Sequence, residues 1–181
     1  MIAGLIPMRY ARALYKYAAE TDSNSDVYKE IKNVVGAFEA NPGLEKVLSN
    51  PFVSAEDKSK LLLAAAGNKP GDAYTRFVKL ILDHKRENFA YLIALAYRDY
   101  YRKENKISQV KISTAAKLPD AEMQKLRGVV ERAFPDTTFE YETSVDPDLI
   151  GGFIIDVDSV RMDASVSGEL EQLRQNLLRS N

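Results

Sequence analysis

Cysteine is absent from the 181-residue sequence, and histidine occurs only once. Without cysteine the chain has no disulfide framework, no thiolate nucleophile and no cysteine-based metal site. The single histidine, His84, stands beside two basic residues near the end of a predicted helix, where positive charge complements the helix dipole. It has no serine, cysteine or metal-ligating partner at a suggestive spacing. These absences argue against an enzyme, and we expect no cofactor.

Long apolar runs and a phosphate-binding loop are also absent. No apolar stretch approaches the roughly 18 residues that a membrane-spanning helix needs. Residues 1–8 lack the basic start of a secretory signal peptide. The glycine pair Gly151-Gly152 precedes a predicted strand rather than a helix, so it does not fit a phosphate-binding loop. The sequence therefore predicts a soluble chain that reaches a membrane only through a partner.

The charge of the chain is nearly balanced, with 25 Lys/Arg against 26 Asp/Glu and a formal net charge of -1. Residues 1–105 carry 16 basic and 13 acidic side chains, whereas residues 106–181 carry 9 and 13. No broad basic excess supports nucleic-acid binding. The two parts would suit different partners, but a random imbalance between two solvated surfaces explains the numbers equally well.

Hydrophobic periodicity divides the chain into two parts. Residues 7–104 repeat apolar positions at helical spacing, broken by Pro, Gly and Asn, which predicts a bundle of six short helices. After Lys106 the period changes to that of strands, and the elements follow a βαββα-like order. We therefore expect a mainly α protein, with an N-terminal helical bundle over residues 1–105 and a small α/β domain over residues 106–181.

Capping residues indicate where several helices begin and end. Ser54 followed by Asp57 resembles a capping box and opens the fourth helix, which closes at Gly67. Asn88 is expected to cap the sixth helix, and Pro119 begins the helix of the second domain. The residues of that helix predicted to face inward are Leu126, Val129, Val130, Ala133 and Phe134.

The opening helix, predicted from Pro7 to about Asp22, has two apolar flanks where a helix with one buried face needs only one. The first flank consists of Tyr10, Ala13, Leu14 and Tyr17, and the second of Met8, Ala11, Tyr15, Ala18 and Ala19. Two flanks indicate either that this helix is central in the bundle or that one flank lines a groove.

The C-terminal stretch indicates a strand, a turn, a second strand and a helix. The first strand has inward-facing positions at Phe139, Tyr141, Thr143 and Val145. A turn follows at residues 146–148, and Gly151-Gly152 permits a bend before a strand over residues 153–157. Ser165 stands where a helix N-cap is needed, before apolar residues at Val166, Leu170, Leu173 and Leu177.

These motifs resemble the F-type ATP synthase delta subunit family, which includes the mitochondrial oligomycin-sensitivity-conferring protein. The C-terminal signature comprises Val145-Asp146, Leu149-Ile150-Gly151-Gly152 and Asp163-Ala164-Ser165-Val166. Arg9-Tyr10-Ala11-Arg12-Ala13-Leu14-Tyr15 is similar to the opening helix of the family, and Ile112-Ser113-Thr114-Ala115-Ala116-Lys117-Leu118 to the start of its C-terminal domain. Ser167 departs from the pattern, because many relatives carry arginine there, so no role of that arginine is transferred.

The resemblance implies a noncatalytic stator subunit that joins the catalytic head to the peripheral stalk and resists rotor torque during proton-driven ATP synthesis. It implies that the N-terminal domain binds the N-terminal helix of the alpha subunit between its first and fifth helices. The C-terminal domain would hold the C-terminal end of the b subunit. A bacterial source is favoured, with the chain peripheral on the cytoplasmic face of the inner membrane through a hetero-oligomeric ATP synthase.

Two sets of residues are candidates on this basis. The groove for the alpha-subunit helix is predicted to be lined by Ala11, Leu14, Tyr15, Phe77, Val78 and Ile81, although some of these must be bundle core. The structural signature consists of Gly151, Gly152, Asp163 and Ser165, where Gly152 is expected to serve backbone geometry rather than a ligand.

Two other classes of function remain to be weighed. A nucleic-acid or regulatory adaptor is suggested by Tyr97, Tyr100 and Tyr101 beside basic residues, but a core helix with its tyrosine hydroxyls at the surface is favoured. An Asp-dependent metal enzyme is suggested by the C-terminal aspartates. Their spacing does not match an EF-hand, and turns, capping and solubility explain them more simply.

Overall fold

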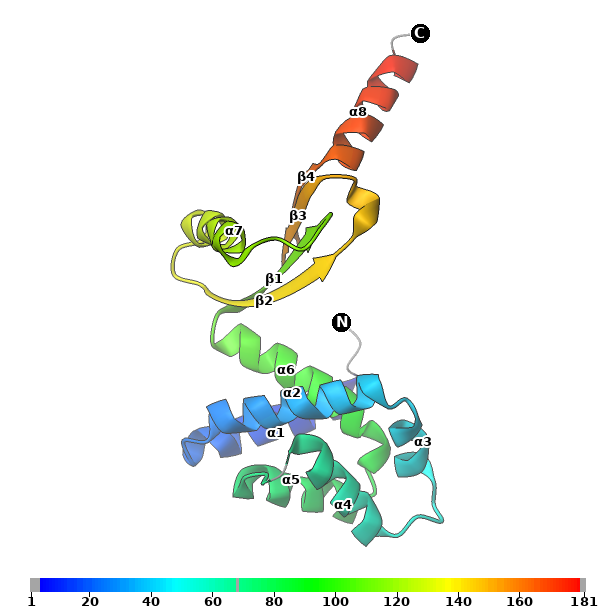
Figure 1. The fold of residues 1–181 in the computed structure, drawn as a ribbon. Helices are drawn as coiled ribbons and strands as arrows, with labels where there is room; N and C mark the ends of the chain where they lie inside the picture. Colours follow the sequence, from blue (N-terminus) through cyan, green and yellow to red (C-terminus); the bar gives the residue numbers. More distant parts are fainter. Residues whose placement is uncertain (1–3, 68, 180–181) are drawn as a thin grey trace. The chain divides into compact units, whose positions relative to one another are not determined.

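The computed structural model describes residues 4–67 and 69–179 (Figure 1). The chain divides into two compact units, the first ending at Glu104 and the second beginning at Asn105. This division lies one residue before the boundary that the change of period indicates.

The first unit is helical. Its elements are α1 (Leu5–Glu20), α2 (Asn24–Ala40), α3 (Gly43–Ser49), α4 (Ala55–Ala66), α5 (Asp72–Asp83), the 3₁₀ turn η1 (Glu87–Phe89) and α6 (Ala90–Glu104). Ser54 caps α4 as predicted, because its Oγ accepts a hydrogen bond from the Asp57 N–H at 3.1 Å. The capping role predicted for Asn88 is wrong: Asn88 lies inside η1, which leads directly into α6.

The core of the first unit is built from one buried stripe on each long helix. In α1 this stripe is Pro7, Ala11, Leu14 and Ala18, at spacings of three and four residues. Helix α6 packs against both α1 and α2. Its buried residues include Ile93, which is fully buried. Because the buried stripe of α1 contains two alanines, neighbouring helices approach it closely.

Tyrosine rings pack on one another inside this unit. The Tyr15 ring makes edge contacts with Tyr100 and Tyr101 of α6, and Tyr28 stacks on Tyr101 with 4.0 Å between ring centroids. Tyr97 is fully buried, and its hydroxyl is buried with it, contrary to the expectation of a surface hydroxyl. Burial raises the pKa of Tyr97. The tyrosines of α6 therefore serve packing.

The second unit is a four-stranded sheet with helix α7 (Asp120–Ala133) packed on one face. The other elements are β1 (Ile107–Thr114), β2 (Thr138–Val145), the 3₁₀ turn η2 (Pro147–Leu149), β3 (Gly152–Val157), β4 (Val160–Ser165) and α8 (Val166–Arg179). The strand order is β2-β1-β3-β4, in which β1 runs parallel to β2 and antiparallel to β3. Helix α7 makes the crossover between the two parallel strands, as such pairs require.

Strand β4 is absent from the predicted βαββα order, which therefore has one strand too few. It forms a hairpin with β3, with Val157 paired to Val160. All of its residues except Ser165 are exposed, and charged side chains separate its few apolar residues. Its sequence does alternate apolar and polar residues, so the signal for a strand was present, but over only six residues.

The core of the second unit is small and centres on β1 and β3. Its buried residues are Val110, Ile112, Val130, Ile155 and Val157. Several positions predicted to face inward are exposed: Thr143, Val145, Val129 and Ala133. The first two lie on β2, which has a neighbouring strand on one side only, and the other two lie beside the narrow buried face of α7.

Candidate partner-binding groove

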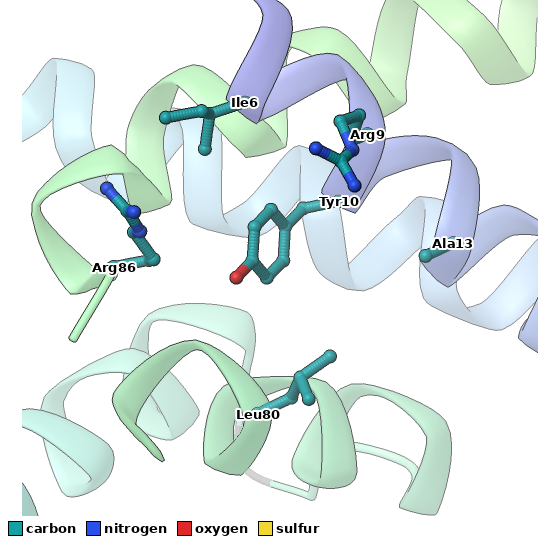
Figure 2. Close-up of a pocket in the computed structure, with 6 residues that line it drawn as sticks. All are labelled: Ile6, Arg9, Tyr10, Ala13, Leu80 and Arg86. Atoms are coloured by element: carbon teal, nitrogen blue, oxygen red, sulfur yellow. The ribbon is translucent and has the colours of Figure 1, made fainter. Parts of the chain in front are cut away.

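Two adjoining cavities lie between α1 and α5. One has a volume of about 350 Å³ and is lined by Ala13, Leu14, Tyr17, Ala73, Arg76, Phe77 and Leu80. The other has a volume of about 310 Å³ and is lined by Ile6, Arg9, Tyr10, Ala13, Leu80 and Arg86 (Figure 2). Ala13 and Leu80 border both cavities, so the two form one continuous depression. We refer to it as the α1–α5 groove.

The groove exists because α1 presents a second stripe next to its buried one. Ile6, Tyr10, Ala13 and Tyr17 each precede a buried residue by one position and recur at the same spacing of three or four residues. Ala13 is exposed, and Leu80 on the facing wall keeps 40% of its surface exposed. The walls are therefore apolar side chains that the bundle itself leaves uncovered.

Polar contacts join the two walls of the groove. The Tyr10 hydroxyl lies 3.0 Å from His84 Nδ1, directly after α5. Farther along α1, the Arg76 guanidinium donates to the Tyr17 hydroxyl at 3.0 Å. Figure 2 shows Tyr10 and Leu80 projecting into the space between the two helices. These contacts set the separation of the walls while leaving the apolar strip between them open.

The residues proposed from sequence for this groove are divided by the structure. Leu14 and Phe77 line it. Ala11, Val78 and Ile81 are at most 1% exposed and belong to the core. Tyr15 packs instead on the tyrosines of α6. The sequence shows both flanks of α1, but two of the three α1 candidates, Ala11 and Tyr15, lie on the flank that faces the core and α6.

The groove residues that the sequence analysis did not propose are Ile6, Arg9, Tyr10, Ala13, Tyr17, Ala73, Arg76, Leu80 and Arg86. A signal for some of them was present. On α5 the positions 73, 77 and 80 form an apolar stripe beside the core stripe at 74, 78 and 81, as the first flank of α1 does. Matching these two secondary stripes would have predicted the pair of walls.

The glycine pair of the second unit lies at the start of β3. Gly152 has a φ of 75°, and a Cβ there would lie 2.1 Å from the Ala164 carbonyl oxygen on β4. A side chain is therefore excluded both by backbone conformation and by space. A Cβ at Gly151 would meet Val166 Cγ2 at 3.0 Å. The pair allows β3 to approach β4 and the start of α8.

Asp163 and Ser165 join β4 to α8. Ser165 Oγ accepts a hydrogen bond from the Gly168 N–H at 3.0 Å, so Ser165 caps α8 as predicted. The Ser165 hydroxyl and N–H both donate to Asp163 Oδ1, at 2.6 and 2.9 Å. These hydrogen bonds from Ser165 hold the pKa of Asp163 below its ordinary value. The signature residues thus fix the direction in which α8 leaves the sheet.

The C-terminal aspartates have structural partners. Asp146 accepts from the Asp148 N–H, Asp158 accepts from the Gln109 N–H, and Asp156 forms an ion pair with Arg161 at 2.6 Å. Within residues 4–67 and 69–179, no group of three or more His, Asp or Glu side chains is arranged to hold a metal ion. Turn formation, capping and one ion pair account for the carboxylates of Asp146, Asp156, Asp158 and Asp163.

Comparison with known proteins gives the family. The sequence profile described as ATP synthase delta (OSCP) subunit matches residues 6–177. The chain belongs to this family. It is 39% identical to the ATP synthase subunit delta of Parabacteroides distasonis over 178 residues, covering 98% of each chain. It is 38% identical to that of Phocaeicola vulgatus over 183 residues, covering all of this chain and 98% of the relative.

The fold is also similar to a solved structure. A chain in the cryo-electron microscopy structure of the Toxoplasma gondii mitochondrial ATP synthase hexamer matches with a TM-score of 0.69. The match covers 97% of this chain and 98% of that chain, at 22% sequence identity. The arrangement of elements is therefore that of a known fold.

Family membership determines the general role of the chain. As a member of the ATP synthase delta (OSCP) family, the chain is a peripheral-stalk stator component, a structural rather than a catalytic member of a hetero-oligomeric complex. It is peripheral to the membrane complex. Among its described helices none is both long enough and apolar enough to cross a bilayer.

Proposed function

We propose that the α1–α5 groove holds the amphipathic N-terminal helix of the alpha subunit, and that the second unit holds the C-terminal end of the b subunit. The chain would then link the catalytic head to the membrane-anchored stalk. The observation that carries the first part is an open apolar groove of suitable length between two helices. The named relatives are bacterial delta subunits, which supports a position on the cytoplasmic face of a bacterial inner membrane.

The dimensions of the groove suit one short helix. The α1 wall runs from Ile6 to Tyr17. At 1.5 Å per residue this is about 16 Å, or roughly three helical turns. Helix-in-groove recognition uses apolar anchors spaced by three and four residues over such a length. Ala13, small and exposed, leaves room for an anchor side chain at the centre.

A substitution at Ala13 tests this part of the proposal. Ala13→Trp places an indole where the docked helix would lie, so we expect a synthetic peptide of the alpha-subunit N-terminal segment to bind at least tenfold more weakly. Ala19→Trp is the matched control, because Ala19 is an exposed alanine of α1 that does not line the groove. Isothermal titration calorimetry on the full chain measures both. Absence of wild-type binding at high micromolar peptide would refute the proposal.

The second part of the proposal concerns α8. Leu170 and Leu173 expose 53% and 58% of their surfaces. Apolar residues at 166, 170, 173 and 177 alternate spacings of four and three, which is the seam of a two-helix coiled coil. The b subunit is the stalk component that the family resemblance assigns to this domain, and this seam suits a helical end.

A charge placed in the seam tests the assignment to α8. Leu173→Asp puts a carboxylate on the apolar stripe and is expected to abolish capture of a soluble b-subunit fragment. Gln175→Asp adds the same side chain two positions later, on the opposite side of the helix. Equal capture by both variants and the wild type in a pull-down would show that b binds elsewhere on the chain.

A further inference from the structure

We infer that the α1–α5 groove selects the helix that it binds by charge. The bound helix carries carboxylates beside both ends of its apolar stripe. The carboxylates at one end face Arg9 and Arg86, and those at the other end face Arg76. This inference rests on the proposed function and specifies the partner that the groove accepts. It also predicts the direction in which the helix lies, because the two ends of the groove differ in charge.

The lining of the groove is one-sided in charge. The described residues that border its two cavities include three arginines and neither Asp nor Glu. The arginines come from both walls, Arg9 from α1, Arg76 from α5, and Arg86 from just beyond the end of α5. An apolar strip with cations on both sides complements an amphipathic helix whose apolar face is bordered by acidic residues.

The arginines are placed at the ends of the groove rather than along it. Figure 2 shows the side chains of Arg9 and Arg86 on either side of Tyr10. At the other end, Arg76 is held by its hydrogen bond to the Tyr17 hydroxyl. From Arg9 to Tyr17 along α1 is about 12 Å, or roughly two helical turns. The carboxylates of the occupant should therefore be separated by about seven or eight residues.

The charge at the two ends is unequal, and this gives the groove a polarity. Two guanidinium groups lie at the Tyr10 end and one at the Tyr17 end. A docked helix carries partial positive charge at its N-terminus and partial negative charge at its C-terminus. We expect the C-terminal end of the occupant at the Tyr10 end, where two arginines meet both its acidic side chains and its last carbonyl groups.

Arg12 provides a matched control on the same helix. Its guanidinium lies 5.6 Å from the centroid of the Tyr100 ring of α6, and it borders neither cavity. Arg12→Gln therefore makes the same change of residue and of net charge as Arg9→Gln, away from the groove. The comparison separates a local contact from the general effect of lowering the positive charge of the first unit.

The test uses the full chain and the alpha-subunit N-terminal peptide, with a second peptide in which every Asp and Glu is replaced by Asn or Gln. Arg9→Gln/Arg86→Gln leaves the hydrogen bond between Arg76 and Tyr17 intact, and circular dichroism establishes that the variants fold. Isothermal titration calorimetry at 50 and 300 mM salt is expected to show roughly threefold to tenfold weaker binding for each arginine removed. Arg12→Gln should bind as the wild type does. The neutral peptide should not distinguish the double variant from the wild type.

The possible failures are distinguishable. If the wild type binds the native peptide, Ala13→Trp blocks it, and the double variant binds as tightly as wild type at both salt concentrations, charge selection is wrong and the groove assignment stands. If Arg12→Gln weakens peptide binding as much as the substitution of each groove arginine by Gln does, charge selection is also wrong, because the effect would then be long-range. If the wild type binds neither peptide, the proposed function fails, and the inference fails with it.

Discussion

Gly152 offers the sharpest test of how the second unit is built. Replacing it by alanine adds one methyl group to a residue whose φ is 75°, opposite Ser165 in the pairing of β3 with β4. The added Cβ would lie 2.1 Å from the Ala164 carbonyl oxygen, which is backbone and cannot rotate away. Strand β4 must therefore move, or β3 must change conformation.

The cost of Gly152→Ala has two parts. A left-handed conformation costs a non-glycine residue about 1–2 kcal/mol. Relief of the overlap costs about 1–3 kcal/mol more, by analogy with overpacked cores. We expect a loss of about 3 kcal/mol in the free energy of opening, equivalent to an increase of roughly a hundredfold in the open population. The displacement should extend to Ser165 and hence to the cap of α8.

Hydrogen–deuterium exchange of the full chain measures this locally. Amides of β3, β4 and the first turn of α8 should exchange about a hundredfold faster in Gly152→Ala, while those of α1–α6 keep their wild-type rates. Gly128→Ala is the control, since Gly128 lies inside α7 with no atom within 4 Å of an added Cβ. It should stabilise α7 by about 0.5–1 kcal/mol. Unchanged exchange at β3 and β4 in Gly152→Ala would contradict the steric argument.

Three further predictions concern buried polar contacts. Lys58 contacts Glu87 at 2.8 Å, and only 6% of the lysine side chain is exposed. Lys58→Met leaves Glu87 without this cation and should lower the free energy of unfolding, measured by urea titration, by about 2–3 kcal/mol. The double variant Lys58→Met/Glu87→Leu should recover that loss. Partial burial raises the pKa of Glu87, but the hydrogen bonds from Lys58 and from the backbone N–H of Glu87, together with the positive charges of Lys58 and Lys85, outweigh burial and hold the pKa below its ordinary value of 4.5. The stabilisation from Glu87 is therefore present above pH 4.5 and is lost as the pH falls below it, and Glu87→Gln should flatten that acid limb. Ser165→Ala removes the acceptor of the Gly168 N–H and should lower stability by about 1 kcal/mol, seen as faster amide exchange in the first turn of α8; an unchanged rate would contradict the capping assignment.

Elements with local signals were predictable from sequence. Ser54 and Gly67 mark the ends of α4. An N-cap side chain and a C-terminal glycine with positive φ both depend on only a few consecutive residues, so both can be recognised in the sequence. Strand β4 was missed although Val160, Met162 and Ala164 alternate with polar residues, because a six-residue run with one β-branched residue carries a weak strand signal. Asn88 is a residue type that often caps helices, but here the 3₁₀ turn η1 leads into α6 and already supplies the backbone hydrogen bonds that a capping side chain would make.

The groove was predictable as a feature but not in its residues. The two apolar flanks of α1 left open whether this helix is central in the bundle or lines a groove; in the structure one flank packs in the core and against α6, and the other borders the α1–α5 groove. Ala11 and Ala13 are the same residue type, two positions apart, yet one is fully buried and the other is exposed beside both cavities. Which flank faces the core depends on where α5 and α6 pack, and that is decided by contacts between residues about sixty to ninety positions apart.

The floor of the groove explains why binding and stability should be coupled in this unit. Leu14 and Phe77 line the groove and are also core residues, only 2% and 7% exposed. A docked apolar side chain would therefore rest on the core itself and enlarge it, rather than contact a separate surface. A ligand that binds only the folded state raises the free energy of unfolding, and the increase grows with the logarithm of the ratio of the ligand concentration to the dissociation constant. If the groove holds the alpha-subunit helix as proposed, that helix would pack on Leu14 and Phe77 as an additional helix of the first unit and would stabilise both walls of the groove.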